Sequence, residues 1–269
     1  MGTMDYIALE VSSLNRQIIK DDQSHWHGNR NSDARQSAVA LDCDGFQVRH
    51  GEIFGILGTD SSGKSALVRC FADCLLADEG RITISGQGVL RDQTAVKRLI
   101  NRVLTDASLF QKLTPLENLL YGARLYSLGE QPARACAVEV LQQMGLDEET
   151  MSRPVGELSA CVQRKVAAAC ASLTQPVFLL LDEPTRGLPP TAKREVQSFI
   201  EELRDAYNAT ILLTTRDVWE AETLCDRVAI LNEGQIVAVG TPEGLKDLVP
   251  HTNGHTPTLE DVLVELIGG

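Results

Sequence analysis

The sequence has little of several features that define large classes of protein. Aromatic residues make up only 4% of its 269 residues, and its 25 basic side chains are outnumbered by 37 acidic ones, for a net charge of −12. Because a nucleic-acid binder needs a basic face to neutralise phosphates, this balance argues against one. The longest strictly apolar runs, such as 177–181, are far below the roughly 18 residues of a membrane span. We therefore expect a globular chain that neither binds nucleic acid nor crosses a membrane.

Cysteine pairs and zinc-ligand clusters are also missing. The seven cysteines are an odd number, none belongs to a C-x-x-C pair, and the five histidines show no zinc-ligand spacing. Scattered cysteines of this kind indicate reduced thiols in a reducing cytosol, not a disulfide framework or a structural zinc site. The first ten residues have neither the basic nor the apolar region of a signal peptide. A cytoplasmic location is therefore expected.

Strand and helix patterns alternate along most of the chain. Apolar residues recur at every second position in 6–14 and 39–48, which is typical of half-buried strands. The polar segment between them, 16–38, is interpreted as an exposed loop or hairpin insertion. The alternation that follows indicates an α/β fold with a parallel sheet covered by helices on both faces. The predicted strands are 52–57, 81–85, 102–105, 177–181, 210–214 and 228–231, and the predicted helices are 64–76, 115–144 with a break near 129–132, 159–175, 191–206 and 217–225.

A glycine-rich loop lies between the strand at 52–57 and the helix that follows it. Residues 58–65 read GTDSSGKS, which fits the pattern G-x-x-x-x-G-K-[ST] without a gap. Backbone N–H groups of such a loop turn inward to bind phosphate, Lys64 would contact the β and γ phosphates, and Ser65 would ligate magnesium. The alternative, a chance Gly/Ser turn, would arise in roughly one unrelated chain in a hundred. The predicted nucleotide-binding residues are Gly58, Thr59, Asp60, Ser61, Ser62, Gly63, Lys64, Ser65 and Ala66.

Two carboxylates end the apolar strand at 177–181. Asp182 and Glu183 follow it directly, and the C-terminal edge of a parallel sheet is where ligands bind. Asp182 is expected to hold magnesium through the coordination shell of the ion, and Glu183 is expected to act as the base that polarises the attacking water. A solvated strand end is the alternative when the motif stands alone. Together with the phosphate loop, the two acids predict a complete site for ATP and Mg²⁺.

At this point the chain resembles an ATP-binding cassette (ABC) nucleotide-binding domain over nearly its full length. The segments that carry the resemblance, in order, are IALEVSSL, GEIFGILG, LTPLENLLYGARLYSLG, VGELSACVQRKVAAACA, FLLLDEPTRGL, AETLCDRVAILNEGQIVAVGTPEGLK and TLEDVLVELIGG. Its end segments look most like bacterial ATPase subunits of drug, lipid and polysaccharide exporters. The resemblance implies a P-loop NTPase fold with a mostly parallel sheet, an antiparallel β subdomain and an inserted α-helical subdomain.

The resemblance also implies an organisation and partners. The whole chain, 1–269, would be one nucleotide-binding domain, with the α-helical subdomain at 106–157 and a C-terminal helical tail at 241–269. A second nucleotide-binding domain, identical or different, would complete a head-to-tail dimer that sandwiches two ATP molecules. That dimer would drive separate transmembrane permease subunits from the inner face of the cell membrane. The helical insert would dock the permease, although its apolar residues are also expected to pack its own core.

Several positions depart from the family pattern. In the signature LSGGQ, Ser159 is retained as a helix cap aimed at a partner's γ-phosphate, whereas Cys161 replaces the second glycine. A Cβ at that position is expected to hinder close approach to the phosphate. Thr105 stands at the Q-loop glutamine, Pro189 at the D-loop aspartate and Arg216 at the switch histidine. Arginine cannot accept a proton, although it could hold a γ-phosphate as a cation.

Three functions fit this pattern of retained and altered residues. The first is a working transport ATPase, which Lys64, Ser65, Asp182 and Glu183 favour. The second is a catalytically impaired cassette that acts as the regulatory or structural half of a heterodimer, which the altered positions favour. The third is a non-transport P-loop ATPase. Loss of one positioned polar group commonly lowers a rate by about 10²–10³, so we expect ATP binding with slow hydrolysis.

Overall fold

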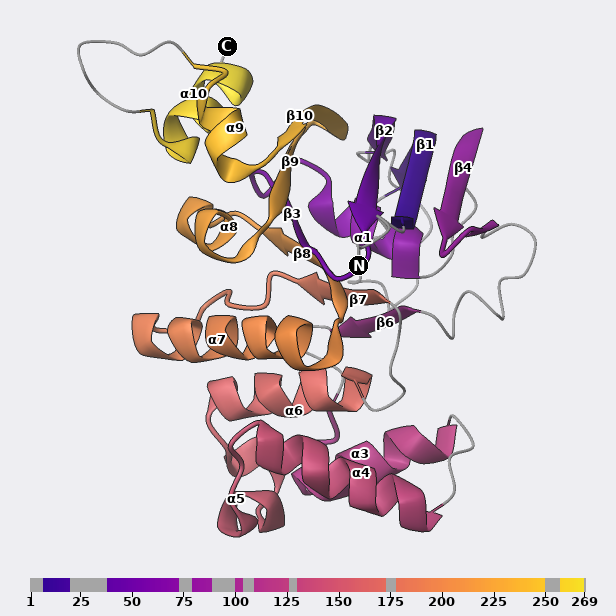
Figure 1. Cartoon of the computed structure of the whole chain (residues 1–269), viewed down its shortest axis with the longest axis vertical. Coiled ribbons are helices and arrows are strands. Elements are labelled where there is room, and N and C mark those ends of the chain that lie inside the picture. The colour runs from indigo at the N-terminus through magenta and orange to yellow at the C-terminus, as the bar shows by residue number, and fades with distance from the viewer. Residues whose placement is uncertain are drawn as a thin grey trace, which may run out of the picture.

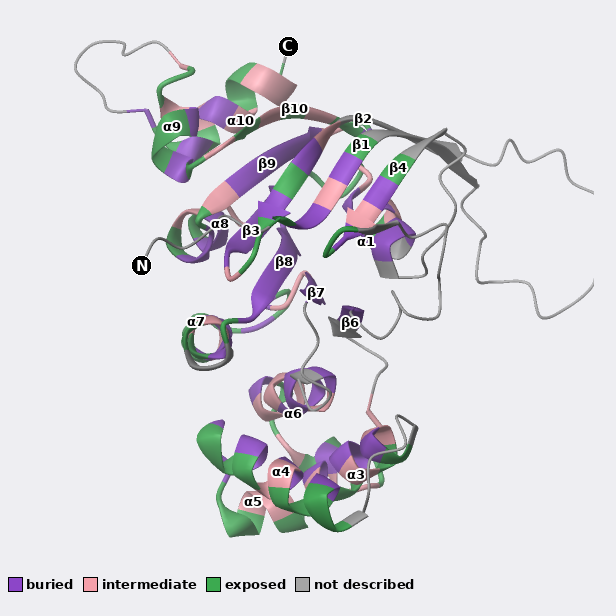
Figure 2. Cartoon of the chain, turned by 45° about the vertical axis from the view of Figure 1, so that its right-hand side comes forward, coloured by how far each residue is buried: buried purple, intermediate pink, exposed green. Residues whose placement is uncertain are grey.

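A six-stranded sheet forms the centre of the molecule in the computed structural model, which describes residues 7–19, 38–72, 79–88, 100–103, 109–125, 130–172, 178–249 and 257–268. Its strand order is β10-β9-β3-β8-β7-β6, and every neighbouring pair is parallel except β10 with β9. Strands covered on both faces read as continuous apolar runs, and β3 and β8 are buried along their whole length (Figure 2). The strands are β3 (Ile53–Leu57), β6 (Ile100–Val103), β7 (Phe178–Asp182), β8 (Thr210–Thr215), β9 (Arg227–Asn232) and β10 (Gln235–Gly240).

A second, antiparallel sheet has the order β2-β1-β4-β5. Its strands are β1 (Ile7–Ile19), β2 (Ala38–Arg49), β4 (Glu79–Ile84) and β5 (Gln87–Gly88). The prediction that an exposed loop begins at 16 is wrong at its edges, because β1 continues to Ile19, which pairs with Ala38 of β2. The hairpin alternative therefore holds for the arms of this segment, and 20–37 lie outside the described residues. A core that includes Leu9, Phe46 and Phe54 joins this sheet to the central one.

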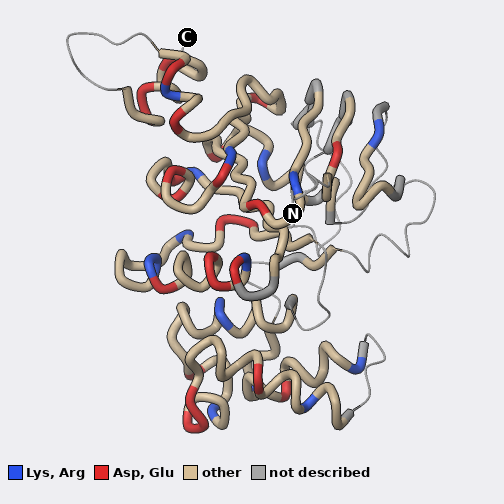
Figure 3. The backbone as a smooth tube through the Cα atoms, in the orientation of Figure 1, with Lys and Arg blue, Asp and Glu red and all other residues tan. Residues whose placement is uncertain are grey.

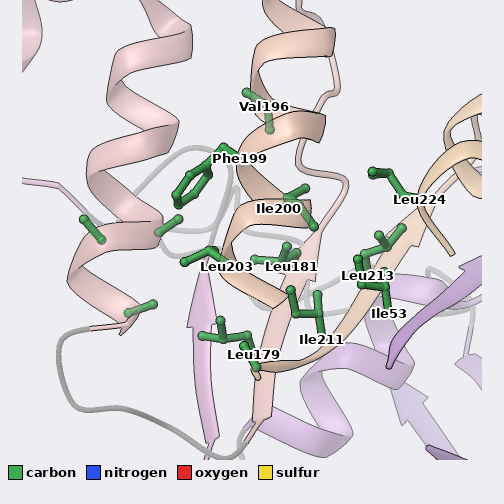
Figure 4. Close-up of a cluster of buried hydrophobic side chains, with 14 of the residues drawn as sticks. Ile53, Leu179, Leu181, Val196, Phe199, Ile200, Leu203, Ile211, Leu213 and Leu224 are labelled. Carbon is green, nitrogen blue, oxygen red and sulfur yellow. The ribbon is translucent and has the colours of Figure 1, made fainter. Parts of the chain in front are cut away.

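Helices cover the central sheet. They include α1 (Lys64–Ala72), α7 (Pro190–Tyr207) and α8 (Val218–Leu224), and α6 (Ala160–Ser172) packs between α7 and the helical subdomain. Helix α7 begins with Pro190 in its first turn and ends at Asn208, which adopts a left-handed conformation (φ 49°). Its apolar residues recur at helical spacing, and Figure 4 shows Ile200 near Leu181 and Ile211 of the neighbouring strands, with Phe199 on the side of α7 that faces α6. Burial of this face fixes α7 beneath the strands that carry the site.

The helical subdomain lies at the end of the molecule opposite the antiparallel sheet (Figure 1). It contains α3 (Pro115–Leu125), α4 (Glu130–Gln143), α5 (Glu148–Ser152), a 3₁₀ turn at Val155–Glu157 and the helix α6. Leu119, Ala137 and Leu141 are fully buried, so most of the apolar residues do pack the subdomain's own core. Phe110 and Tyr121 form an edge-to-face pair at 4.7 Å yet remain 48% and 45% exposed.

After β10, the last strand of the central sheet, the chain continues into α9 (Pro242–Lys246) and α10 (Leu259–Ile267). Thr258 starts α10 with a capping box: its hydroxyl accepts from the Asp261 N–H, and the Asp261 carboxylate accepts from the Thr258 N–H. Acidic positions run from α5 at one end of the molecule to α10 at the other (Figure 3). Of the helices that the structure describes, none combines the length and the apolar character needed to cross a bilayer.

Candidate functional site

The phosphate loop leaves the C-terminal end of β3 and passes into α1. A side chain at Gly58 would place a Cβ only 2.5 Å from the Leu231 carbonyl oxygen and 2.6 Å from Ser62 Oγ, so only glycine fits there. Gly63 has φ +100°, a conformation that side chains rarely adopt. The Ser62 carbonyl accepts a hydrogen bond from the Gly234 N–H (2.8 Å), which ties the loop to the turn between β9 and β10. The loop is therefore shaped by the sheet around it before any ligand binds.

Lys64 is the cation at the centre of the loop. Its Nζ donates to the carbonyl oxygens of Gly58 and Thr59, both at 2.7 Å, and lies 3.8 Å from Glu183 Oε1. The side chain is 4% exposed, and burial lowers the pKa of the ammonium while the charge of Glu183 opposes that shift. Sequence reasoning placed Lys64 and Glu183 in one site although they are far apart in the chain, and the structure brings them together.

The two carboxylates at the end of β7 are fixed by Thr214 of β8. The Thr214 hydroxyl donates to Asp182 Oδ1 at 2.7 Å, and the Glu183 N–H donates to Thr214 at 3.1 Å. Glu183 itself adopts φ +47°, an unusual conformation for a residue with a side chain, and such strained backbone concentrates at functional sites. Its side chain is 11% exposed and turns back toward Lys64. Both acids are thus held at the sheet edge where the phosphate loop ends.

A tight turn follows Glu183 and contains an arginine that sequence reasoning missed. Arg186 Nη1 lies 2.9 Å from Glu183 Oε2, and the Arg186 N–H donates to the Glu183 carbonyl. The guanidinium of Arg164, on α6, donates to the carbonyl oxygens of Pro184 and Arg186. The only available signal was a basic residue three positions after a candidate base, which sequence alone cannot distinguish from a surface arginine.

A cleft of about 290 Å³ opens beside this turn. Its lining alternates in charge, because Arg186 and Lys193 face it together with Glu183 and Asp217. Lys193 Nζ and Asp217 Oδ2 are 2.7 Å apart, which joins α7 to the start of α8. Glu220 also lines the cleft and is 1% exposed, and burial raises the pKa of its carboxyl. The remaining lining residues are Thr185, Gly187, Thr215 and Arg216.

Arg216, at the switch position, reaches across to the phosphate loop. Its Nη1 lies 3.0 Å from Asp60 Oδ2, with both side chains about half exposed or more (49% and 63%). Residue 216 directly follows β8, and its neighbour Asp217 caps α8 by accepting from the N–H groups of Trp219 and Glu220. The switch segment and the phosphate loop are therefore joined by an ion pair that a neutral histidine would not make.

The signature residues begin α6 on the exposed side of the molecule. Ser159 caps the helix as predicted, accepting from the Val162 N–H at 3.3 Å. The Cys161 side chain is 5% exposed, and Sγ donates to Glu195 of α7 at 3.1 Å, so it packs in the contact between α6 and α7. Its expected effect on the approach of a partner's phosphate stays a prediction. Pro189 precedes α7 without a side-chain cap, and Thr105 lies outside the described residues.

The oxygen atoms at this sheet edge suit magnesium. Mg²⁺ favours oxygen ligands and is usually held by one or two carboxylates together with waters and substrate phosphates. Ser65 is exposed at the start of α1, and Asp182 is half-buried at the end of β7. Within the described ranges, no group of three or more His, Cys, Asp or Glu side chains is arranged to hold a metal. The donor set fits a magnesium ion shared with phosphate oxygens, not a site closed by the protein alone.

The fold and the loop define a P-loop nucleotide-binding protein, since a Gly-rich loop joins a buried parallel strand to a helix and faces two strand-end carboxylates. The model of the family described as "ABC transporter" matches residues 41–186, more than half of the sequence. The chain belongs to the ABC transporter family. The expected fold class is confirmed, including the antiparallel sheet beside the parallel one.

Several named relatives are drug-resistance or export ATP-binding proteins. The daunorubicin resistance ATP-binding protein DrrA3 of Streptomyces coeruleorubidus is 37% identical over 77% of this chain and 65% of its own length. The linearmycin resistance ATP-binding protein LnrL of Bacillus subtilis is 30% identical over 74% of this chain and 64% of its own. The Nod factor export ATP-binding protein I of a Rhizobium species is 34% identical over 74% and 65%. The chain thus spans slightly less than two thirds of the length of these relatives.

Solved structures agree with the sequence relatives. CbiO1 from Clostridium perfringens, described as part of the ABC transporter complex cbiONQ, has a TM-score of 0.75 at 26% identity, and the match covers 90% of this chain and 91% of that one. A structure described as an ATP-binding subunit of an ABC transporter has a TM-score of 0.74 at 26% identity and covers 96% and 99%. The described fold therefore matches nearly the full length of these two solved chains.

Proposed function

We propose that this chain is the ATP-binding subunit of an ABC exporter. It binds ATP with Mg²⁺ and couples nucleotide-driven dimerisation to separate membrane permease subunits. The observation that carries the proposal is the buried Lys64 ammonium, which the loop's own carbonyl oxygens hold 3.8 Å from Glu183. A phosphate group satisfies such a cation better than two neutral carbonyl groups do, because a charge-assisted hydrogen bond is the stronger one.

The residues divide the work of phosphoryl transfer between them. Lys64 and the loop N–H groups bind the phosphates. Ser65 and Asp182 would hold a magnesium ion, which would supply positive charge to neutralise the phosphates. Glu183 accepts a proton from the water that attacks the γ-phosphorus. The new P–O bond forms as the bond to the ADP oxygen breaks, which leaves ADP and inorganic phosphate.

The relatives and the surface support the proposed partners. Names that specify drug resistance and Nod factor export support an export role for this chain. The exposed start of α6, where Ser159 caps the helix, supports a dimer in which it serves the partner's nucleotide. Phe110 and Tyr121 supply an exposed aromatic pair on the helical subdomain that suits permease docking.

Slow hydrolysis is the second part of the proposal. The switch position carries Arg216, which cannot accept a proton and is paired with Asp60. Because a missing positioned group commonly lowers a rate by about 10²–10³, we expect turnover well below that of a fully active transport ATPase. The same observation favours a second function, in which the chain binds ATP as the regulatory half of a heterodimer and leaves hydrolysis to its partner.

Two measurements on the purified chain test the proposal. Titration with a fluorescent ATP analogue in the presence of Mg²⁺ should show saturable binding, and Lys64→Ala should weaken it by about ten- to a hundredfold. Lys112→Ala, which changes an exposed lysine of the helical subdomain, should leave the affinity unchanged. Equal binding by wild type and Lys64→Ala would refute the nucleotide-binding assignment.

Phosphate release then separates the two functions. Turnover above the Lys64→Ala background, abolished in Glu183→Gln, would support a transport ATPase. Bound ATP without turnover, both alone and with the permease, would instead favour the regulatory half of a heterodimer. If Glu183→Gln left turnover unchanged, the role of Glu183 as the base would be wrong.

A further inference from the structure

Glu183 is held by cations at both of its carboxylate oxygens. Arg186 Nη1 lies 2.9 Å from Oε2, and Lys64 Nζ lies 3.8 Å from Oε1. The carboxylate is only 11% exposed, whereas Arg186 is 54% exposed and approaches it from the solvent side. A base that accepts a proton from water needs a carboxylate oxygen turned toward that water. In this arrangement each oxygen faces a positive charge instead.

The backbone holds Arg186 in this position. Glu183 and Gly187 both have positive φ (47° and 72°), and the turn between them is closed by a hydrogen bond from the Arg186 N–H to the Glu183 carbonyl. Arg164, on α6, donates to the carbonyl oxygens of Pro184 and Arg186 and so anchors the same turn from outside. With its backbone fixed on both sides, Arg186 loses less conformational freedom in forming the ion pair than a residue on a mobile loop would.

We expect a bound nucleotide to affect the contact of Lys64 with Glu183 and to leave that of Arg186 unchanged. Lys64 belongs to the phosphate loop, so we expect a bound phosphate to compete with Oε1 for its ammonium and to leave that oxygen more open. Arg186 lies outside the loop and lines the cleft beside it, so the phosphate-loop contacts of a nucleotide do not involve its guanidinium. We therefore expect the pair at Oε2 to persist when nucleotide binds and to withhold one oxygen of the base from water.

We propose that Arg186 is a positioning residue that restrains Glu183 and lowers the rate of ATP hydrolysis. The inference rests on the proposed function and extends it, because it identifies a cause of slow turnover within the catalytic turn that is separate from the altered switch position. Removing the Arg186 guanidinium should raise the rate of ATP hydrolysis, whereas removing a residue that helps to align the base would lower it.

The test compares Arg186→Ser with wild type in the full chain, by phosphate release at saturating and at limiting MgATP. We expect kcat to rise about three- to tenfold, the effect of an ion pair of moderate strength, with KM for MgATP changed less than twofold. Arg186→Lys keeps a positive charge and should stay within twofold of wild type. Arg194→Ser, which removes an exposed arginine of α7 outside the cleft, is the matched control and should change nothing.

Repeating the substitution in the Glu183→Gln variant shows whether Arg186 acts through Glu183 or through a general effect on the structure. If Arg186 acts through Glu183, the increase should disappear when Arg186→Ser is combined with Glu183→Gln. An increase of equal size in that background, or an unchanged or reduced kcat in the single variant, overturns the proposal. Titration with the fluorescent ATP analogue and thermal unfolding accompany each variant. If the wild type does not bind nucleotide, the proposed function is wrong. If the wild type binds nucleotide but Arg186→Ser does not raise the rate, only the proposed restraint of Glu183 by Arg186 is wrong.

Discussion

Substitution of Gly58 by alanine tests how closely the phosphate loop is fitted to the sheet. The added Cβ would lie 2.5 Å from the Leu231 carbonyl oxygen and 2.6 Å from Ser62 Oγ, distances well inside van der Waals contact. Neither neighbour is free to move. Leu231 is fully buried in β9, and Ser62 is 1% exposed, with its hydroxyl donating to the Thr59 carbonyl at 2.9 Å.

This overlap should lower the stability of the Gly58→Ala variant. Forcing one carbon into a well-packed site typically destabilises a protein by about 1–3 kcal/mol, and we expect a loss in that range for Gly58→Ala. The shifted loop would also misdirect the N–H groups that bind phosphate. Losing one such charge-assisted hydrogen bond corresponds to about a ten- to hundredfold loss of ATP affinity.

Gly122 provides the matched control. It lies inside α3, and a Cβ there would meet no other atom within 4 Å. Alanine should therefore stabilise the helix by about 0.5–1 kcal/mol and leave ATP affinity unchanged. Urea unfolding and ATP-analogue titration measure both quantities for both variants. If Gly58→Ala unfolds at the wild-type midpoint and binds ATP normally, the close approach to Leu231 is not real. An equal loss in Gly122→Ala would show that the effect has no connection with the loop.

Three further predictions concern packing and ionisation. Phe199→Ala, which removes a core side chain of α7 that is 5% exposed, should lower the free energy of unfolding by about 3–5 kcal/mol in urea. Burial raises the pKa of the Cys161 thiol to about 11, with Glu195 adding to the shift, so at pH 8 maleimide should modify Cys161 far more slowly than half-buried Cys136, as peptide mass spectrometry would show. Burial raises the pKa of Glu220 above its usual 4.5, so this group favours the folded state below pH 4.5 and loses that contribution as pH rises through its folded value. The stability gained by Glu220→Gln should therefore grow between pH 4 and pH 7, and a difference independent of pH would contradict the assignment.

Local sequence signals were enough to predict the loop and the sheet edge. The pattern GTDSSGKS and the run that ends in Asp182 and Glu183 each specify their own backbone, because a glycine-rich turn and a doubly buried strand are short-range features. The pairing of Lys64 with Glu183 was also predictable, since C-terminal ends of parallel strands meet at one edge. These parts of the site depend on neighbouring residues and on one general rule of topology.

The contacts that sequence reasoning missed depend on geometry between distant segments. The contact of Cys161 with Glu195 joins two helices, α6 and α7, and no pattern in either helix indicates it. The ion pair between Arg216 and Asp60 joins residues 156 positions apart, and no pattern in either segment indicates the other. Arg186 illustrates a third difficulty: only the tight turn after Glu183 brings an otherwise ordinary surface residue onto the base.

The anchoring of the turn by Arg164 has a mechanical consequence. Ser159 caps helix α6, and five positions after it Arg164 donates to the carbonyl oxygens of Pro184 and Arg186, which follow Glu183. A tilt of α6 would therefore shift the turn that positions Glu183 in the same chain. In the head-to-tail dimer that we propose, the start of α6 would contact the partner's nucleotide, whereas Glu183 would act on the nucleotide of its own subunit. Helix α6 would then connect the nucleotide of one subunit to the catalytic base of the other.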